Sequence, residues 1–328
     1  MIATPPVPQE LLDALRNHAE FIILGHKNPD SDCLNSQLAM GAVLQMLGRQ
    51  FHLVSPGPFE RHEIKHLASQ FSLEIPEDVL ERKPAIIVVD CSTLDRIAPF
   101  DTVIDGLTTI VIDHHASGEP FGDISYNVPR AFSVTFLIYH IIKALDLPLT
   151  PELAQALLFG LATDTGYFRH INGGRSEVFS MVAELAEAGA NPAEIYHQMY
   201  GDRSFRSKQL LGLLLSRTEQ LYNGKLLFTW ETLEEHTQFG EKERDSESLY
   251  AQLLSVEGCA VVVYLRQEAE NSCTVGFRAA SRSSIDVGLI ASNLGGGGHR
   301  KASGTTLQMG FDKARATVIG ILEFYLGE

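Results

Sequence analysis

The sequence predicts an α/β protein with two domains: an N-terminal domain built on a parallel sheet with flanking helices, and a smaller α+β domain at the C-terminus. Three observations support this fold class. The length of 328 residues fits two domains of ordinary size. Short apolar runs alternate with helix-like segments through the first 190 residues, which is typical of parallel strands joined by crossover helices. From about residue 220 onward the pattern changes to short strand-like segments.

The elements of the first half follow from the spacing of apolar residues. Compact apolar runs predict buried parallel strands, and longer apolar or amphipathic segments predict helices. Gly48 and Gly189 are suited to end two of these helices. In chain order, we expect a helix at 11–20, a strand at 21–24, a helix at 32–47, strands at 51–54, 86–89 and 109–112, and helices at 132–145, 151–163 and 176–188.

The second half begins after a helical connector. The sequence predicts a first domain at 1–190, the connector at 191–215 and the second domain at 216–328. The charged stretch 239–247 is interpreted as a solvated loop. The remaining expected elements are a helix at 207–219, strands at 226–230, 259–265 and 274–278, and helices at 287–294 and 313–326.

Composition excludes several classes of protein. Lys and Arg number 26 and Asp and Glu 41, which gives a net charge of −15 and disfavours the coating of long nucleic acids. Hydrophobic residues make up 45%, so a packed core is expected. There is no apolar run long enough for a membrane span, and the N-terminus lacks a secretory pattern. The four dispersed cysteines form neither a zinc cage nor a disulfide framework, so we expect a cytoplasmic protein.

Ionisable residues follow the apolar strands at the points where each strand ends. Taken singly, each has a simpler explanation as a helix cap or a turn residue. Because the carboxyl ends of parallel strands line one crevice, however, we expect all of these residues to converge. They are His26, Asp30 and Asp32 after the first strand, Asp90 after the third, Asp113, His114 and His115 after the fourth, and Asp164 after a later helix.

Four carboxylates in one crevice would repel one another strongly unless cations were present. Two divalent metal ions would neutralise Asp30, Asp32, Asp90 and Asp164, and histidine rings would add neutral nitrogen ligands. Aspartate and histidine without cysteine suit Mn²⁺ or Mg²⁺, with Co²⁺ as a substitute, better than structural zinc.

These motifs resemble those of the DHH phosphoesterase superfamily, in both order and spacing. The matching segments are 26–32 (His-Lys-Asn-Pro-Asp-Ser-Asp), Val89-Asp90, Asp113-His114-His115 and Asp164-Thr165-Gly166. The glycine run 295–298 with His299, followed by Ala302-Ser303-Gly304, resembles the motif of the DHH-associated C-terminal domain. The resemblance covers nearly the whole chain and is strongest to the nano-RNase and pAp-phosphatase branch.

The resemblance implies a site with two Mn²⁺ ions bridged by Asp90. His26 and Asp30 would complete the ligands of one ion, and Asp32, His114 and Asp164 those of the other. Asp113 would orient a histidine ring, and His115 would face the scissile phosphate as a donor or general acid. A bridging hydroxide would be the nucleophile.

The resemblance also implies that the second domain recognises the substrate, with the active site in the cleft between the domains and the connector as a hinge. Glycines can bring backbone N–H groups close to a phosphate. Whether Arg278 or Arg282 is the family's phosphate-binding arginine stays open. The expected substrate-binding residues are Arg278, Arg282, Gly296, Gly297, Gly298 and His299.

The implied function is a manganese-dependent phosphoesterase. It would cleave RNA fragments of about two to five nucleotides to mononucleotides, or convert pAp to AMP. A phosphodiesterase for cyclic di-AMP or for the linear dinucleotide pApA is the alternative, and a non-catalytic nucleotide sensor is an alternative of another class. We expect small nucleotides as partners, with neither long duplexes nor membranes. Whether the protein forms a homodimer stays open.

Overall fold

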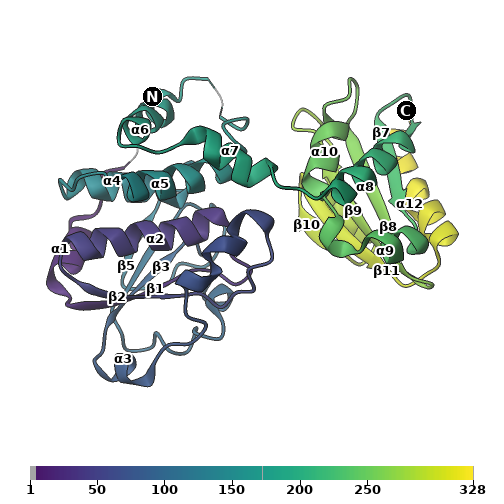
Figure 1. Ribbon diagram of the computed structural model, residues 1–328. Helices are drawn as coiled ribbons and strands as arrows, with labels where there is room; N and C mark the ends of the chain where they lie inside the picture. Colours follow the sequence, from purple (N-terminus) through teal and green to yellow (C-terminus); the bar gives the residue numbers. More distant parts are fainter. Residues whose placement is uncertain (1–4, 172, 328) are drawn as a thin grey trace. The chain divides into compact units, whose positions relative to one another are not determined.

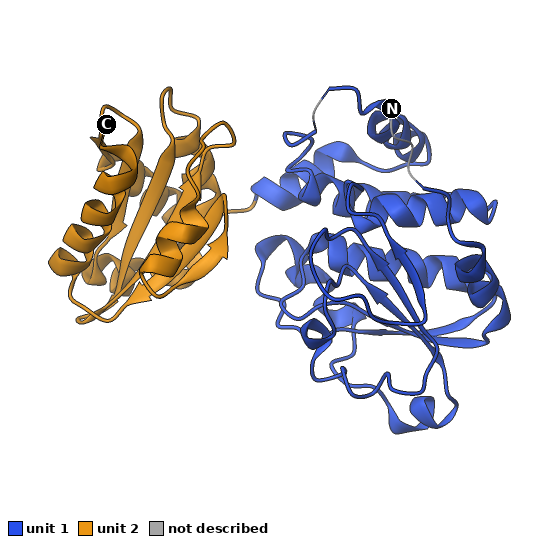
Figure 2. Cartoon of the chain, turned by 180° about the vertical axis from the view of Figure 1, so that it is seen from behind, with its two compact units in different colours: residues 1–201 blue, residues 202–328 orange. Residues whose placement is uncertain are grey.

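The computed structural model describes residues 5–171 and 173–327. Its contacts divide the chain into two units, residues 1–201 and 202–328 (Figure 2). Within the described residues, no helix has both the length and the apolar character needed to cross a membrane.

The first unit is built on a five-stranded parallel sheet in the order β2-β1-β3-β4-β5 (Figure 1). This confirms the predicted α/β class. β5 was not predicted from the sequence, because its residues alternate in burial and form no apolar run. The strands are β1 Glu20–Leu24, β2 Gln50–Val54, β3 Ala85–Val89, β4 Thr109–Asp113 and β5 Ile124–Asn127.

Both faces of this sheet are buried, which explains why its inner strands are continuous apolar runs. Phe21 and Ile23 of β1 pack into one core, and Ile22 and Leu24 pack into another. On the first face, α2 packs against α4 and α5 (Figure 1). The helices of this unit are α1 Gln9–Asn17, α2 Ser31–Met46, α3 Glu77–Glu81, α4 Val134–Ala144, α5 Pro151–Asp164, α6 Ser176–Glu187 and α7 Pro192–Tyr200, with 3-10 helices at His62–Gln70 and Leu94–Ile97.

The second unit contains a six-stranded mixed sheet in the order β10-β11-β9-β8-β7-β6. β7 and β8 are parallel, and the other neighbours are antiparallel. The α+β character of this unit is therefore confirmed. The strands are β6 Glu219–Leu221, β7 Leu226–Glu231, β8 Val261–Ala269, β9 Ser272–Ala279, β10 Gly297–His299 and β11 Ala302–Leu307.

Different helices cover the two faces of this second sheet. One face packs into a core that includes Phe277, Ile290 of α11 and Val318 of α12. On the other face, Leu210 of α8 and Tyr250 of α10 pack in a core with residues of β7 and β8. The helices are α8 Phe205–Ser216, α9 Leu233–Phe239, α10 Ser246–Leu254, α11 Val287–Asn293 and α12 Phe311–Leu326, with a 3-10 helix at Glu241–Glu243.

The interpretation of 239–247 as a solvated loop is wrong. Glu243 and Asp245 are both buried. The Asp245 side chain caps α10 by accepting from the Ser248 N–H at 3.2 Å, and it lies 3.2 Å from Lys208 Nζ. The charges in this stretch thus anchor α8 and α10 to each other.

The connector predicted at 191–215 contains two helices, one that starts after Asn191 and one close to the helix expected at 207–219. α7 ends at Tyr200 and packs in the core of the first unit, whereas α8 begins at Phe205 and packs in the second. The residues at 201–204 are not helical.

Candidate metal centre and substrate-binding face

Asp90 lies at the centre of a cluster of histidines and aspartates at the carboxyl edge of the parallel sheet. It directly follows β3 in a left-handed backbone conformation with φ 56°, and its N–H donates to the carbonyl of Ile112 at 3.0 Å. Asp90 Oδ2 lies 3.5 Å from His26 Nε2, and Oδ1 lies 3.5 Å from His114 Nε2. Asp90 therefore joins the histidines that follow β1 and β4.

The other predicted ligands surround this centre. Asp164, the last residue of α5, has Oδ2 3.2 Å from His114 Nε2. Asp32 lies in the first turn of α2. One of its carboxylate oxygens lies within 4.8 Å of the ligand atoms of His114 and Asp164. Asp30 caps α2, and its Oδ1 lies 3.9 Å from His26 Nε2. The structure thus brings together the six residues predicted as metal ligands, namely His26, Asp30, Asp32, Asp90, His114 and Asp164.

Both histidines present their Nε2 atoms to the carboxylates. His26 Nδ1 lies 2.8 Å from the Lys27 carbonyl oxygen, and His114 Nδ1 lies 3.3 Å from that of Ala131. Because a carbonyl oxygen only accepts, Nδ1 carries the hydrogen, and the Nε2 lone pair of each neutral ring faces the aspartates. Acceptors that face one another repel unless a proton or a metal ion lies between them. Metal-ligating histidines adopt this arrangement.

Asp90 Oδ1 is buried and has no hydrogen-bond donor among the described residues. Such an atom is costly unless an ion or a water satisfies it. The carboxylate and imidazole groups around it suit Mn²⁺ or Mg²⁺. The residues at the carboxyl edge therefore fit divalent metal ions.

The electrostatics of the metal-free centre support the same conclusion. Burial, together with the charges of Asp32 and Asp90, raises the pKa of Asp164 to about 9. Burial and the charge of Asp90 likewise raise the pKa of Asp32 to about 7. Burial disfavours a charged His114, yet the surrounding carboxylates, Asp90 first, outweigh it and raise its pKa to about 10. Without cations, the cluster thus retains protons to limit its negative charge.

Asp32 is held by the N-terminus of α4. Its carboxylate accepts from the N–H of Val134 at 2.6 Å, and from the N–H and the hydroxyl of Thr135 at 3.1 and 2.9 Å. Gly160 of α5 leaves room for this contact, since a Cβ there would lie 2.7 Å from Asp32 Oδ1. Neither Thr135 nor Gly160 was predicted from the sequence. Ser133, a typical helix cap, was the local signal for a helix start here.

Asp113 and His115 form a hydrogen-bonded pair beside the centre. His115 Nδ1 lies 2.8 Å from Asp113 Oδ1, and Asp113 is buried at the end of β4. His115 Nδ1 also lies 3.7 Å from Asp90 Oδ1. A buried carboxylate that accepts from Nδ1–H fixes the orientation of the ring.

Cys33, which directly follows Asp32, also lies beside the centre. Its Sγ atom lies within 4.8 Å of the ligand atoms of His26 and Asp90, and the thiol is buried. Burial raises the pKa of this thiol, which favours its neutral form.

In the second unit, the sheet register separates the two candidate arginines. Arg278 pairs with Ala302, which in turn pairs with His299, so these three residues share one face of the sheet. Arg282 lies beyond the end of β9, where it is exposed. Arg278 and His299 are therefore brought to one surface, and Arg282 is not on a strand of that surface.

The glycines of the run 295–298 differ in their surroundings. A Cβ at Gly296 would lie 2.2 Å from the carbonyl oxygen of Gly304, and one at Gly298 would lie 2.6 Å from Ser303 Cα. Both are therefore needed where β10 packs against β11. Gly295 and Gly297 both have open space where a Cβ would stand, so these two members of the run have a free surface.

The comparisons with known proteins agree with this fold. The model of the DHH family N-terminal domain matches residues 20–161, and that of the DHHA1 domain matches residues 225–323. The chain belongs to the DHH family, and it is a hydrolase of the phosphoesterase type.

Among individual relatives, the chain is similar to the bifunctional oligoribonuclease and PAP phosphatase NrnA of Thermus thermophilus. The two are 30% identical over 90% of this chain and 87% of the relative. The cyclic-di-AMP phosphodiesterase PdeA of Listeria monocytogenes is 25% identical over 92% of this chain and 47% of its own length. An exopolyphosphatase-related protein from Bacteroides fragilis has the same fold, with a TM-score of 0.87, 23% identity and 99% coverage of both chains.

Proposed function

We propose that this protein is a manganese-dependent phosphoesterase that hydrolyses short oligoribonucleotides to mononucleotides and converts pAp to AMP. The observation that carries the proposal is the cluster around Asp90, in which the predicted ligands converge on a buried oxygen without a donor. The similarity to an oligoribonuclease and PAP phosphatase over 90% of the chain supports the substrate class.

The residues divide between two proposed metal positions. His26 and Asp30 would hold one ion, Asp32, His114 and Asp164 would hold the other, and Asp90 would contribute to both positions. When bound, the ions supply Lewis-acid stabilisation of the phosphate and lower the pKa of the attacking water. The ring orientations of His26 and His114 support this division, because each Nε2 atom already faces the shared carboxylate.

Asp113 and His115 supply proton transfer. The buried Asp113 carboxylate accepts from Nδ1–H of His115, at 2.8 Å, so the ring's Nε2–H can donate to the leaving oxygen when the ring is protonated. The proton then leaves from Nε2, and Asp113 keeps the ring oriented for the next cycle.

Hydrogen bonds from the start of α4, including those from Thr135, fix the orientation of Asp32 at the second proposed metal position. The three donors from the start of α4 immobilise the Asp32 carboxylate, so that it need not reorganise when an ion binds. Arg278 and His299 of the second unit bind substrate phosphate, with Gly297 leaving the surface open.

Hydrolysis of cyclic di-AMP is the second candidate, and the similarity to PdeA favours it. The chain spans about half of the length of that relative. A non-catalytic sensor is less well supported, because the ligand positions are all filled by side chains that can bind a metal.

The substrate class is tested by assaying pApA, pAp and cyclic di-AMP side by side, at matched concentrations with Mn²⁺. We expect rapid release of AMP from pApA and pAp and little attack on the cyclic compound. Faster opening of cyclic di-AMP would move the protein to the second candidate. Binding of Mn²⁺ without hydrolysis of any of the three would contradict the proposal and favour the sensor.

A further inference from the structure

The reaction proposed above makes no use of the buried thiol of Cys33. Its Sγ atom and one ligand atom each of His26 and Asp90 lie within 4.8 Å of one another. Cys33 is fully buried, and His26 and Asp90 are each 3% exposed. Thiol sulfur, imidazole nitrogen and carboxylate oxygen are the donors from which proteins build sites for transition metals. The thiol thus belongs to one cluster with two residues of the first proposed metal position.

The start of α2 places this sulfur at the end of β1. Cys33 is the third residue of α2, and its N–H donates to Asp30 Oδ1 at 3.1 Å. Gly25 leaves room for the sulfur, since a Cβ there would lie 2.2 Å from Cys33 Sγ. The side-chain amide of Gln37 makes only a long contact with the sulfur, at 3.9 Å. The sulfur therefore lies against the backbone directly before His26 and stays available to a ligand.

A second observation in the same cluster points to a cation. Asp90 Oδ1 is buried and has no hydrogen-bond donor among the described residues. Asp90 Oδ2 lies 3.5 Å from His26 Nε2, whose lone pair faces it because Nδ1 carries the hydrogen bonded to the Lys27 carbonyl. A carboxylate and an imidazole lone pair that face each other in a buried place are stabilised by a shared cation. The thiol lies beside that place.

Sulfur would make the two proposed metal positions chemically different. Thiolate and imidazole ligands favour ions such as Zn²⁺ and Co²⁺, whereas carboxylates favour Mn²⁺ and Mg²⁺. The second position has nitrogen and oxygen donors alone, and the first would have nitrogen, oxygen and sulfur. The first set is His26, Asp30, Cys33 and Asp90, and the second is Asp32, Asp90, His114 and Asp164.

We propose that Cys33 is a ligand of the first metal position and gives that position a preference for a thiophilic divalent ion, Zn²⁺ or Co²⁺, over Mn²⁺. The inference rests on the proposed function for the presence of a metal ion beside His26 and Asp90. The sulfur binds the ion as a thiolate, and the thiol proton passes to the solvent. The second position, which lacks sulfur, keeps its preference for Mn²⁺.

Cobalt spectroscopy of the full chain tests this ligand without any hydrolysis. A thiolate bound to Co²⁺ gives an intense charge-transfer band in the near ultraviolet, which nitrogen and oxygen ligands do not give. Titration of the metal-free chain with Co²⁺ should produce this band, and Cys33→Ser should abolish it. Cys33→Ala should abolish it as well, and circular dichroism shows that both variants are folded.

Cys91→Ser is the matched control. Cys91 is also a buried cysteine directly after a proposed ligand, but its Sγ donates to the Thr93 carbonyl at 3.2 Å. Among the described residues it belongs to none of the groups that could hold a metal ion. This variant should keep the band.

Metal affinity gives a second readout. In calorimetric titrations, Cys33→Ser should weaken the binding of Zn²⁺ at the first position by roughly 10- to 100-fold, because a soft ligand is lost. The affinity for Mn²⁺ should change by less than about threefold, since Mn²⁺ gains little from sulfur. An equal loss for the two ions would show that Cys33 supports the centre only by packing, and would overturn the inference.

The spectra also separate this inference from the proposed function. The inference is wrong if the wild type binds two Co²⁺ ions without the band, if Cys33→Ser keeps the band, or if Cys91→Ser loses it too. A chain that hydrolyses pApA but lacks the band keeps the proposed function and loses the inference. A chain that shows a band dependent on Cys33 but hydrolyses neither pApA, pAp nor cyclic di-AMP keeps the inference and loses the proposed function.

Discussion

Asp90 combines an uncommon backbone conformation with an unsatisfied buried oxygen. Aspartate tolerates a positive φ at modest cost, and here that conformation turns the carboxylate toward His26 and His114. The sequence predicted Asp90 from its position after an apolar strand. It could not predict the positive φ, because the pairing of Asp90 N–H with Ile112 depends on the neighbouring strand.

Asp90→Asn is expected to abolish activity while leaving the fold intact. An amide keeps the shape but removes the negative charge that both proposed metal positions would share, so hydrolysis of pApA should fall by about a thousandfold or more. Enzyme assays with calorimetric Mn²⁺ titration measure both effects. Asp105→Asn, at an exposed position, is the control. Retention of wild-type turnover by Asp90→Asn would exclude the proposed role of this carboxylate.

The pKa shifts at the centre predict that metal binding depends on pH. The pKa of Asp164 is raised to about 9 and that of Asp32 to about 7, so both hold protons near neutral pH when no metal is bound. A metal ion binds the carboxylate form, so binding must release protons. Affinity for Mn²⁺ should therefore tighten as pH rises from 6 to 9, and calorimetry in buffers of different ionisation enthalpy should detect proton release. Affinity that stays constant over this range would contradict the shifts.

At the scale of elements, the metal centre depends on the close packing of α2, α4 and α5. Gly160→Ala would place a Cβ 2.5 Å from Thr135 Cγ2 and 2.7 Å from Asp32 Oδ1. We expect a loss of about 1–3 kcal/mol in the free energy of unfolding together with weaker metal binding. Gly320→Ala in α12 meets open space and should gain about 1 kcal/mol from helix propensity. Urea unfolding compares the two variants, and equal effects would show that the packing is not tight.

Glu20, at the start of β1, is the centre of an ion cluster at the amino end of the first sheet. Arg82 donates to both Glu20 carboxylate oxygens at 2.8 Å, and His52 Nε2 lies 2.8 Å from Oε1. The hydrogen bond from Arg82 is the largest influence, and the pKa of Glu20 falls to about 2. A lowered pKa means that this stabilisation is present above about pH 4.5 and is lost as pH falls toward 2.

Glu20→Gln should therefore lower the Tm at pH 7, and its difference from the wild type should shrink as pH falls from about 4.5 toward 2. Thermal melts followed by circular dichroism measure this. Glu81→Gln, exposed on α3, should have little effect at any pH. A difference that is the same at pH 7 and pH 3 would argue against the lowered pKa.

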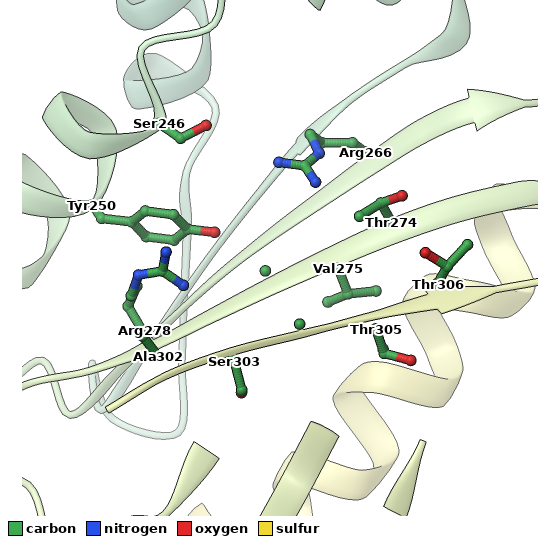
Figure 3. A pocket seen from close by; sticks show the side chains of 12 residues that line it. Ser246, Tyr250, Arg266, Thr274, Val275, Arg278, Ala302, Ser303, Thr305 and Thr306 are labelled. Atoms are coloured by element: carbon green, nitrogen blue, oxygen red, sulfur yellow. The ribbon is translucent and has the colours of Figure 1, made fainter. Parts of the chain in front are cut away.

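The strand-end residues were predictable because the parallel sheet brings the carboxyl ends of β1, β3 and β4 to one edge. The contact between Asp32 and Thr135 was not, since 103 positions separate the two residues and no local pattern links them. The pocket that Arg266 and Tyr250 line in the second unit was not predictable for a related reason (Figure 3). It requires the register of β8 and β9 and the position of α10, which begins inside a stretch taken for a loop.

At the scale of the whole molecule, the two units carry different parts of the proposed reaction. The first holds the candidate metal ligands around Asp90, and the second holds a pocket lined by Arg266 and Arg278. The acidic chain suits short substrates, because few phosphates need to be neutralised. The hinge at 191–215 and the cleft location of the active site stay predictions, and whether the chain forms a homodimer stays open.

In the proposed reaction, hydrolysis depends on two metal ions held around Asp90. The most direct measurement is to remove metal from the full chain with EDTA, titrate it with Mn²⁺, and follow bound Mn²⁺ and pApA hydrolysis together. We predict no hydrolysis without metal, and activity that rises with Mn²⁺ and saturates when two ions are bound per chain. Undiminished hydrolysis by the metal-free chain, or none with two ions bound, would contradict the claim.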